Sequence, residues 1–177
     1  MERRSSPGPD STCDAPHMSQ PGASEVVARA VLSGSREPHR LGADWVPVLA
    51  EVPLFAGLSR RQLRRIAALA RSKRFAQGSA IVRAGAPGNA FYVILDGTVR
   101  VVPTAGRPAT LRAGDSFGEM SLLDGEPRSA DVTAVSEVLT MTIGRAAFAK
   151  LLRSEPQISH GLLRTLAARL RAAERSH

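Results

Sequence analysis

The chain has 177 residues, 43% of them hydrophobic and 4% aromatic, so it can bury one aliphatic core but carries few rings for stacking on exposed bases. The formal net charge is +8, and all of the excess follows residue 50: residues 1–50 hold 5 basic and 6 acidic side chains, while residues 51–177 hold 19 and 10. The single cysteine, Cys13, excludes an internal disulfide, a zinc site built from several thiolates and an iron–sulfur cluster.

Residues 1–44 are rich in proline, serine and glycine, a composition typical of a disordered tail. Within this tail the segment SEVVARAVL (24–32) has helical spacing and predicts at most a transient helix. The tail lacks the apolar stretch of a secretory signal, and the chain has no apolar run near the ~18 residues of a membrane span. With the lone cysteine, these features lead us to expect a cytoplasmic protein without membrane contact. We expect order to begin near Trp45, the only tryptophan of the chain.

A helix is predicted from Ser59, which suits the N-cap position of the segment SRRQLRRIAALARSK. Apolar residues follow at i, i+3, i+4 and i+7, the spacing of one buried helix face. The opposite face carries four arginines, which could contact a phosphate backbone or be solvated. Solvation is the simpler interpretation because any surface helix needs a charged face. These arginines are Arg60, Arg61, Arg64 and Arg65.

Strands are predicted between residues 80 and 143, where short apolar segments rich in valine, isoleucine and threonine replace the helical pattern. The segments are AIVR, AFYVIL, TVRVV and VLTMTI, and glycines separate them at intervals typical of antiparallel sandwiches and barrels. The sequence LDGTV (95–99) places Asp-Gly between two of them, which predicts a β-hairpin with a type I′ turn.

Helical spacing returns after Ile143. The segment GRAAFAKLLRSEP places Phe148, Leu151 and Leu152 on one face, and Pro156 begins a last helix that extends to about residue 174. Apolar residues recur at steps of four along this helix, and the ridge that they form could cover the sheet or pair with a second copy of the chain. The ridge consists of Ile158, Leu162, Leu166 and Leu170, with Leu163 and Ala167 beside it.

The order of helix, strands and helices predicts an α+β fold, an antiparallel β-roll (jelly roll) flanked by N-terminal and C-terminal helices. We divide the chain into a disordered tail (1–44), a β-roll domain (45–155) and a C-terminal helix (156–177) that serves as a lid or a dimer contact. The chain contains no long-period repeat.

The segment FGEMSLLDGEPRSADV (117–132) carries the most specific pattern in the chain. A glycine and a glutamate are followed by a short apolar turn and then by Pro-Arg and a small residue. Together with PLFAGLSRRQL and AGAPGNAFYVILDGTVRV, it resembles the cyclic nucleotide-binding domain family over residues 53–153. The resemblance identifies 117–132 as the family's phosphate-binding cassette, within the domain at 45–155. It implies that nucleotide binding pulls the cassette inward and repositions the helices after Ile143.

Three cassette residues suit the two ends of such a ligand. A cyclic phosphodiester keeps one negative charge at neutral pH, which the permanently charged and fork-shaped guanidinium of Arg128 can bind. An ionised Glu119 is an acceptor, so it can take a hydrogen bond from the ribose 2′-hydroxyl. Gly118 lets the backbone approach the ligand where a Cβ would collide.

The short helical turn predicted for MSLLD completes the site. Its first amides, from Gly118 to Ser121, would point unpaired N–H groups at the anion. Ser129 can add a hydroxyl or amide contact to the phosphate or the base, and the apolar side chains at 120, 122 and 123 are expected to anchor the turn in the core. The candidate ligand-binding residues are therefore Gly118, Glu119, Met120, Ser121, Arg128 and Ser129.

Two other chemistries fit single features of the sequence but fail on context. GDSFG (114–118) matches the G-x-S-x-G pattern of serine hydrolases, with Asp131 and His160 after Ser116, but that elbow joins a parallel strand to a long helix. We therefore assign Ser116 to a turn. A metal-binding jelly roll needs clustered imidazoles, whereas the histidines at 17, 39, 160 and 177 lie outside the strand region. We predict no catalytic residue and no metal ligand.

These observations predict a non-enzymatic sensor with cAMP as the expected ligand, cGMP as the alternative and no other cofactor. Its expected partners are a cyclic purine nucleotide, an unidentified protein effector and, through the last helix, a second copy of the chain. Direct DNA binding is not expected, because the chain ends at His177 without room for a helix-turn-helix domain. Two other functions stay open: a fold that lost its ligand and acts as a dimerisation or interaction module, and a basic accessory protein that binds nucleic acid.

Overall fold

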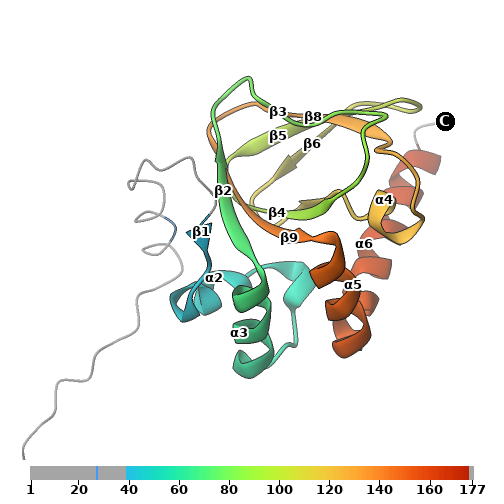
Figure 1. Ribbon diagram of the computed structural model, residues 1–177. Coiled ribbons are helices and arrows are strands. Elements are labelled where there is room, and N and C mark those ends of the chain that lie inside the picture. Colours follow the sequence, from blue (N-terminus) through green and yellow to red (C-terminus); the bar gives the residue numbers. More distant parts are fainter. Residues whose placement is uncertain (1–26, 28–38, 176–177) are drawn as a thin grey trace, which may run out of the picture.

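The computed structural model describes Val27 and residues 39–175, in which two β-sheets face each other and helices gather on one side (Figure 1). The predicted α+β class, an antiparallel β-roll with flanking helices, is confirmed. Two short 3-10 helices are labelled η. In chain order the elements are β1 (His39–Arg40), η1 (Ala43–Trp45), α2 (Val46–Ala50), η2 (Pro53–Phe55), α3 (Arg60–Leu69), β2 (Arg71–Phe75), β3 (Ala80–Val82), β4 (Ala90–Asp96), β5 (Thr98–Pro103), β6 (Ala109–Arg112), β7 (Ser116–Phe117), α4 (Met120–Leu123), β8 (Ala130–Ala134), β9 (Val138–Gly144), α5 (Arg145–Ser154) and α6 (Pro156–Glu174).

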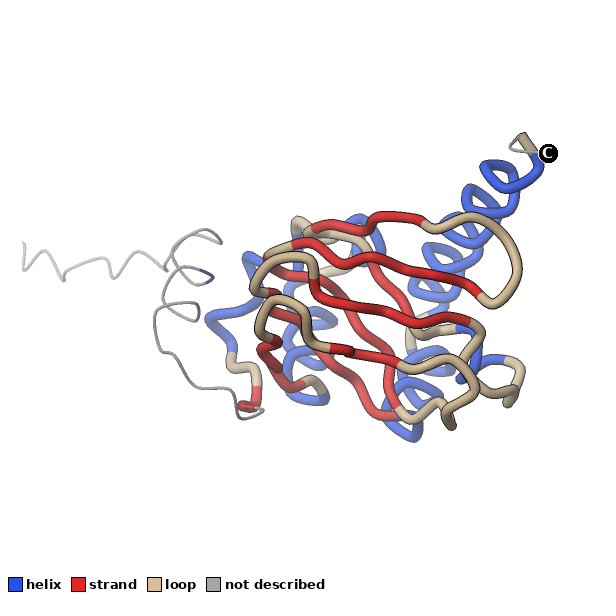
Figure 2. Tube along the Cα trace, turned by 90° about the horizontal axis from the view of Figure 1, so that it is seen from above, coloured by secondary structure: helices blue, strands red, loops and turns tan. Residues whose placement is uncertain are grey.

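Both sheets are antiparallel throughout. One has the strand order β1-β2-β9-β4-β7 and the other the order β3-β8-β5-β6. Figure 2 looks down on the roll, with its strands in red and the helices in blue. Alternation along β4 divides the buried side chains into two clusters: Phe91 and Val93 face the helices, while Tyr92 and Ile94 pack with residues of the other sheet.

The predicted type I′ hairpin at Asp96-Gly97 is wrong. β4 and β5 follow each other there, yet β4 pairs with β9 and β5 pairs with β8 in the other sheet. Gly97 has a φ of 88°, but Asp96 lacks the positive φ that a type I′ turn requires. A Cβ at Gly97 would lie 2.2 Å from the carbonyl oxygen of Glu137. The Asp-Gly pair therefore forms a corner between the sheets, packed against the chain that joins β8 to β9.

The predicted helix is α3, and Ser59 is its N-cap residue, as expected. The Ser59 hydroxyl accepts a hydrogen bond from the Gln62 amide at 3.4 Å, and the Gln62 side chain accepts one from the Ser59 amide at 2.8 Å, which makes a capping box. Leu63, Ile66 and Ala67 are buried. The arginines of the opposite face are all exposed, as predicted.

Order begins before the expected Trp45. β1 pairs with β2, and Leu41 is only 4% exposed, so residues 39–44 belong to the domain rather than to a tail. Neither composition nor periodicity could show this, because a two-residue strand is too short to have a period. The predicted helix at 24–32 lies outside the described residues except for Val27, which packs against the helix-facing cluster. No helix of the described part is long and apolar enough to cross a membrane.

The apolar ridge predicted along α6 is buried only in its first part. Ile158 and Leu162 are 1% and 3% exposed and belong to the helix-facing cluster. Leu166 is partly buried against the same cluster. Leu163 and Leu170, in contrast, are 64% and 62% exposed. One end of the helix is thus integrated into the core, while the other presents apolar side chains to solvent.

Candidate functional site

The predicted cassette lies between β7 and β8, with α4 beside α6 (Figure 1). Gly118 leaves β7 with a φ of 84°, a conformation that favours glycine. A Cβ at this position would lie 2.7 Å from Nη1 of Arg128 and 3.1 Å from the carbonyl oxygen of Ala90. Glycine therefore lets the main chain pass directly against the arginine side chain.

Main-chain atoms hold Arg128, which is 6% exposed. Nη1 donates to the carbonyl oxygen of Gly118 and Nη2 to that of Ala90, both at 2.6 Å. Burial lowers the pKa of Arg128 below its ordinary value, while the nearby Tyr92 and Glu119 act in the opposite direction. Both hydrogen-bond acceptors are uncharged, so they orient the guanidinium without neutralising it. The geometry presents a fixed cation that an anionic ligand could bind.

Glu119 is the N-cap residue of α4 and is 2% exposed. Its Oε1 accepts a hydrogen bond from Nη1 of Arg169, in α6, at 2.8 Å. The second terminal nitrogen of Arg169 donates to the carbonyl oxygen of Ser116. Oε2 of Glu119 is buried and has no hydrogen-bond partner among the described residues. Since buried polar atoms are normally paired, this oxygen is suited to receive one further O–H or N–H group.

The apolar side chains of α4 do not lie as predicted. Met120 and Leu123 are 49% and 47% exposed, and only Leu122 packs partly against the core, so the expectation that all three anchor the turn is wrong. A single helical turn can bury only one face, and Ser121, 2% exposed, occupies it. The Ser129 hydroxyl is exposed and donates to Sδ of Met120 at 3.8 Å.

Arg145, the first residue of α5, joins the cassette to its surroundings. Its Nε and Nη2 donate to the carbonyl oxygen of Gly88 at 3.0 and 2.6 Å, and Nη2 also donates to that of Ser121 at 3.1 Å. A Cβ at Gly88 would lie 2.1 Å from the Ser121 hydroxyl. These contacts fix α4 against the loop before β4 and against the start of α5.

Sequence reasoning missed Arg145 and Arg169, because both lie outside the cassette and no spacing rule connects them to it. The expected turn role of Ser116 is also wrong: this residue lies in β7 and is 3% exposed. The helix after it has only four residues, so GDSFG does not form the strand-to-helix elbow of a hydrolase. In the structure Arg128 contacts Gly118 directly, Glu119 lies near enough to act on the pKa of Arg128, and Arg169 binds Glu119.

The fold and the cassette define an antiparallel β-roll domain with a buried, charged site. Residues 72–155 match the family described as the cyclic nucleotide-binding domain. Residues 72–155 therefore belong to the cyclic nucleotide-binding domain family, as the cassette sequence predicted.

Proteins of several kinds contain segments that are similar to this chain. The chain is 36% identical to a cyclic nucleotide-gated potassium channel of Mesorhizobium japonicum, over 71% of this chain and 35% of the channel. It is 38% identical to a cAMP-dependent protein kinase regulatory subunit of Aspergillus fumigatus, over 59% of this chain and 26% of the subunit. The solved catabolite activator protein of Thermus thermophilus is similar with a TM-score of 0.62 and 34% identity, over 70% of this chain and 61% of that one. The chain thus spans no more than 35% of these two curated relatives.

Proposed function

We propose that the domain binds cAMP between Arg128 and Glu119. One observation carries this proposal: the cassette buries a cation held by two main-chain oxygens and a carboxylate of which one oxygen has no donor among the described residues. The cation is the guanidinium of Arg128, and the carboxylate oxygen is Oε2 of Glu119. In this assignment Arg128 binds the phosphate and Glu119 the ribose 2′-hydroxyl. The remaining ligand contacts are assigned to Gly118, Met120, Ser121 and Ser129.

The choice of cAMP is supported by the kinase relative, whose name states that it is cAMP-dependent. The ribose and the cyclic phosphate are common to cAMP and cGMP, so the two charged residues bind either nucleotide in the same way. A titration with both nucleotides therefore decides between them.

We infer that the domain is a non-enzymatic sensor that signals through its C-terminal helices, and that its output is the position of α6. Arg169 supports this inference, because it joins α6 to the carboxylate that is assigned to the ribose. A nucleotide that hydrogen-bonds to Glu119 changes the relative free energies of the arrangements of α6. The shift in free energy between two arrangements of α6 equals the difference in the free energy with which they bind the ligand. An effector protein that contacts α6 would then respond to the ligand.

Calorimetric titration of the native chain with cAMP and cGMP tests the proposal. We predict that Arg128→Ala weakens binding by about 2–5 kcal/mol, the cost of removing one partner of a desolvated charge pair. Arg100→Ala is the control, because Arg100 is exposed on β5, outside the cassette. An unchanged isotherm for Arg128→Ala would reject the phosphate assignment.

A second candidate function is supported by the exposed apolar side chains of α6. Leu163 and Leu170 are 64% and 62% exposed and lie seven residues apart, so they share one helix face. We propose that this face joins two copies of the chain. Dimerisation and ligand binding are compatible, since the exposed leucines and the Arg169 contact can occupy different faces of the helix.

A further inference from the structure

The two halves of α6 are held in different ways. In the first half, Ile158 and Leu162 are buried, and a Cβ at Gly161 would lie 2.8 Å from the carbonyl oxygen of Leu54 in η2. Residues 163–175 are all at least partly exposed. The first half is therefore the more firmly packed part of the helix.

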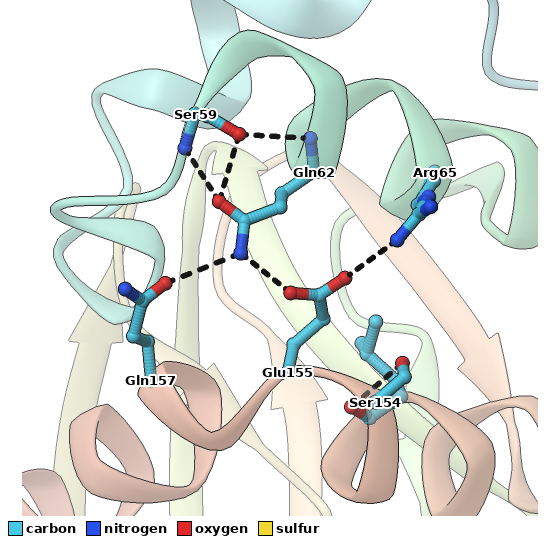
Figure 3. A network of polar contacts seen from close by, with 7 residues as sticks. Ser59, Gln62, Arg65, Ser154, Glu155 and Gln157 are labelled. Atoms are coloured by element: carbon cyan, nitrogen blue, oxygen red, sulfur yellow. Dashed lines mark hydrogen bonds and ion pairs between the residues drawn. The ribbon is translucent and has the colours of Figure 1, made fainter.

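A buried carboxylate fixes the start of that first half (Figure 3). Glu155 lies between α5 and α6 and is 4% exposed. Its Oε2 accepts a hydrogen bond from Nε2 of Gln62 at 2.5 Å, and its Oε1 accepts one from Nη1 of Arg65 at 3.4 Å. Both donors belong to α3. Separation of the α5–α6 junction from α3 would leave a buried carboxylate without these donors, which is costly.

The side chain of Gln62 makes this contact well defined. Its Oε1 accepts hydrogen bonds from the amide and the hydroxyl of Ser59, each at 2.8 Å, as part of the α3 capping box. This leaves Nε2 to donate to Glu155 and, at 3.3 Å, to Gln157 (Figure 3). One amide side chain thus caps α3 and holds the α5–α6 junction at the same time.

Between the two halves, α6 contains two residues that weaken or bend a helix. Gly161 lies in the helix interior, where glycine is unfavourable. The hydroxyl of Thr165 donates to the carbonyl oxygen of Gly161 at 3.1 Å, a contact that tends to bend helices. Beyond this point, the side chain of Arg169 ties the second half to the cassette.

We propose that Glu155 is a positioning residue: it fixes the first half of α6 on α3 and thereby confines ligand-driven movement to the half after Gly161, where Arg169 meets Glu119. The inference rests on the proposed function, because it requires that a cyclic nucleotide reaches Glu119. Displacement of the whole helix together with its α5 junction would instead break the buried contacts of Glu155, and rotation about that junction would expose Ile158 and Leu162.

Hydrogen exchange of the native chain, with and without cAMP, tests where the movement occurs. We expect cAMP to change exchange in residues 163–175 by roughly tenfold, the scale of one charge-assisted hydrogen bond, and to leave 151–162 nearly unchanged. Equal changes in both segments would overturn the proposal. Calorimetry on the same sample separates the two proposals. The absence of cAMP binding would contradict the proposed function. Binding accompanied by equal changes of hydrogen exchange in both segments would contradict only the positioning role of Glu155.

Variants test the ligand-free protein independently of any nucleotide. Glu155→Gln removes the charge, while Gln62→Glu keeps an acceptor for the α3 cap but faces Glu155 with a like charge. Each should raise exchange in residues 151–162 by roughly tenfold. In the ligand-bound protein, each should also let the cAMP-driven change spread into this segment.

The double variant swaps the positions of the acid and the amide. It should therefore regain the slow hydrogen exchange of residues 151–162. Glu174→Gln is the matched control, because Glu174 is exposed near the end of α6. The absence of a rise in both single variants, or of recovery in the combined variant, would contradict the positioning role.

Discussion

At the scale of single residues, the carboxylate of Glu119 connects two parts of the molecule that are distant in sequence. One oxygen is bound by Arg169 of α6, and the other has no donor among the described residues. The carboxylate is therefore partly satisfied without ligand and can still accept a hydrogen bond. In the proposed binding mode, this division lets one acidic residue bind both the ligand and α6.

We predict that Arg169→Ala lowers the free energy of unfolding of the ligand-free protein by about 1–3 kcal/mol, because a buried carboxylate loses its donor. cAMP should recover part of this loss, since its ribose hydroxyl supplies a new donor. Urea unfolding with and without cAMP measures both effects. Arg164→Ala, at an exposed position of the same helix, serves as the control. If Arg169→Ala has the same free energy of unfolding as the native chain, the Arg169–Glu119 ion pair does not contribute to stability.

The sequence was sufficient to select the central residues of the candidate site but not their surroundings. Gly118, Glu119 and Arg128 lie in one short segment with a recognisable order, so they could be predicted. Arg169 reaches the same place only because α6 packs beside α4, and no local pattern records such a contact. The exposure of Met120 was mispredicted for a related reason: hydrophobicity does not tell which face of a one-turn helix is covered.

At the scale of elements, helix propensity favours alanine at position 161, whereas the packing of the helix favours glycine. Alanine is favoured over glycine in a helix by about 1 kcal/mol, but a Cβ here would lie 2.8 Å from the main-chain oxygen of Leu54. We predict that Gly161→Ala destabilises the protein by about 1–3 kcal/mol, because η2 or α6 must shift. Denaturant unfolding measures the change, and Ala168→Gly measures the propensity contribution in the same helix. A more stable Gly161 variant would mean that propensity outweighs the close contact.

The periodicity of apolar residues predicted most helices and the longer strands, but it did not predict how the strands pair. The alternation in AFYVIL and TVRVV is local and is visible in the sequence. Which sheet each strand joins depends on β8 and β9, which lie far along the chain. The Asp-Gly signal at 96–97 was therefore read as a hairpin although it forms a corner.

At the scale of the whole molecule, the exposed leucines of α6 predict association of two copies. We expect the native chain to be a dimer in light scattering and Leu170→Asp to be a monomer, because a charge in an apolar interface is left without a partner. Ala168→Asp, also exposed on α6, is the control for added charge. A native chain that stays monomeric over a wide concentration range would rule out this interface.

The fold class could be predicted at this scale because the order of helical and strand periods allows few architectures. The position of α6 relative to α3 and α4 could not, since it depends on side chains such as Glu155 and Arg169 that find their partners only in the folded state.

The way in which Arg128 is held has a consequence for protein engineering. Its two anchors are peptide oxygens, which every amino acid possesses, so the positive charge stays in place when side chains around it are replaced. Residue 118 is the exception, since a Cβ there would lie 2.7 Å from Nη1 of Arg128 itself. Under the proposed binding mode, the exposed Ser129 can therefore be varied to change the preference among nucleobases while Arg128 stays in position.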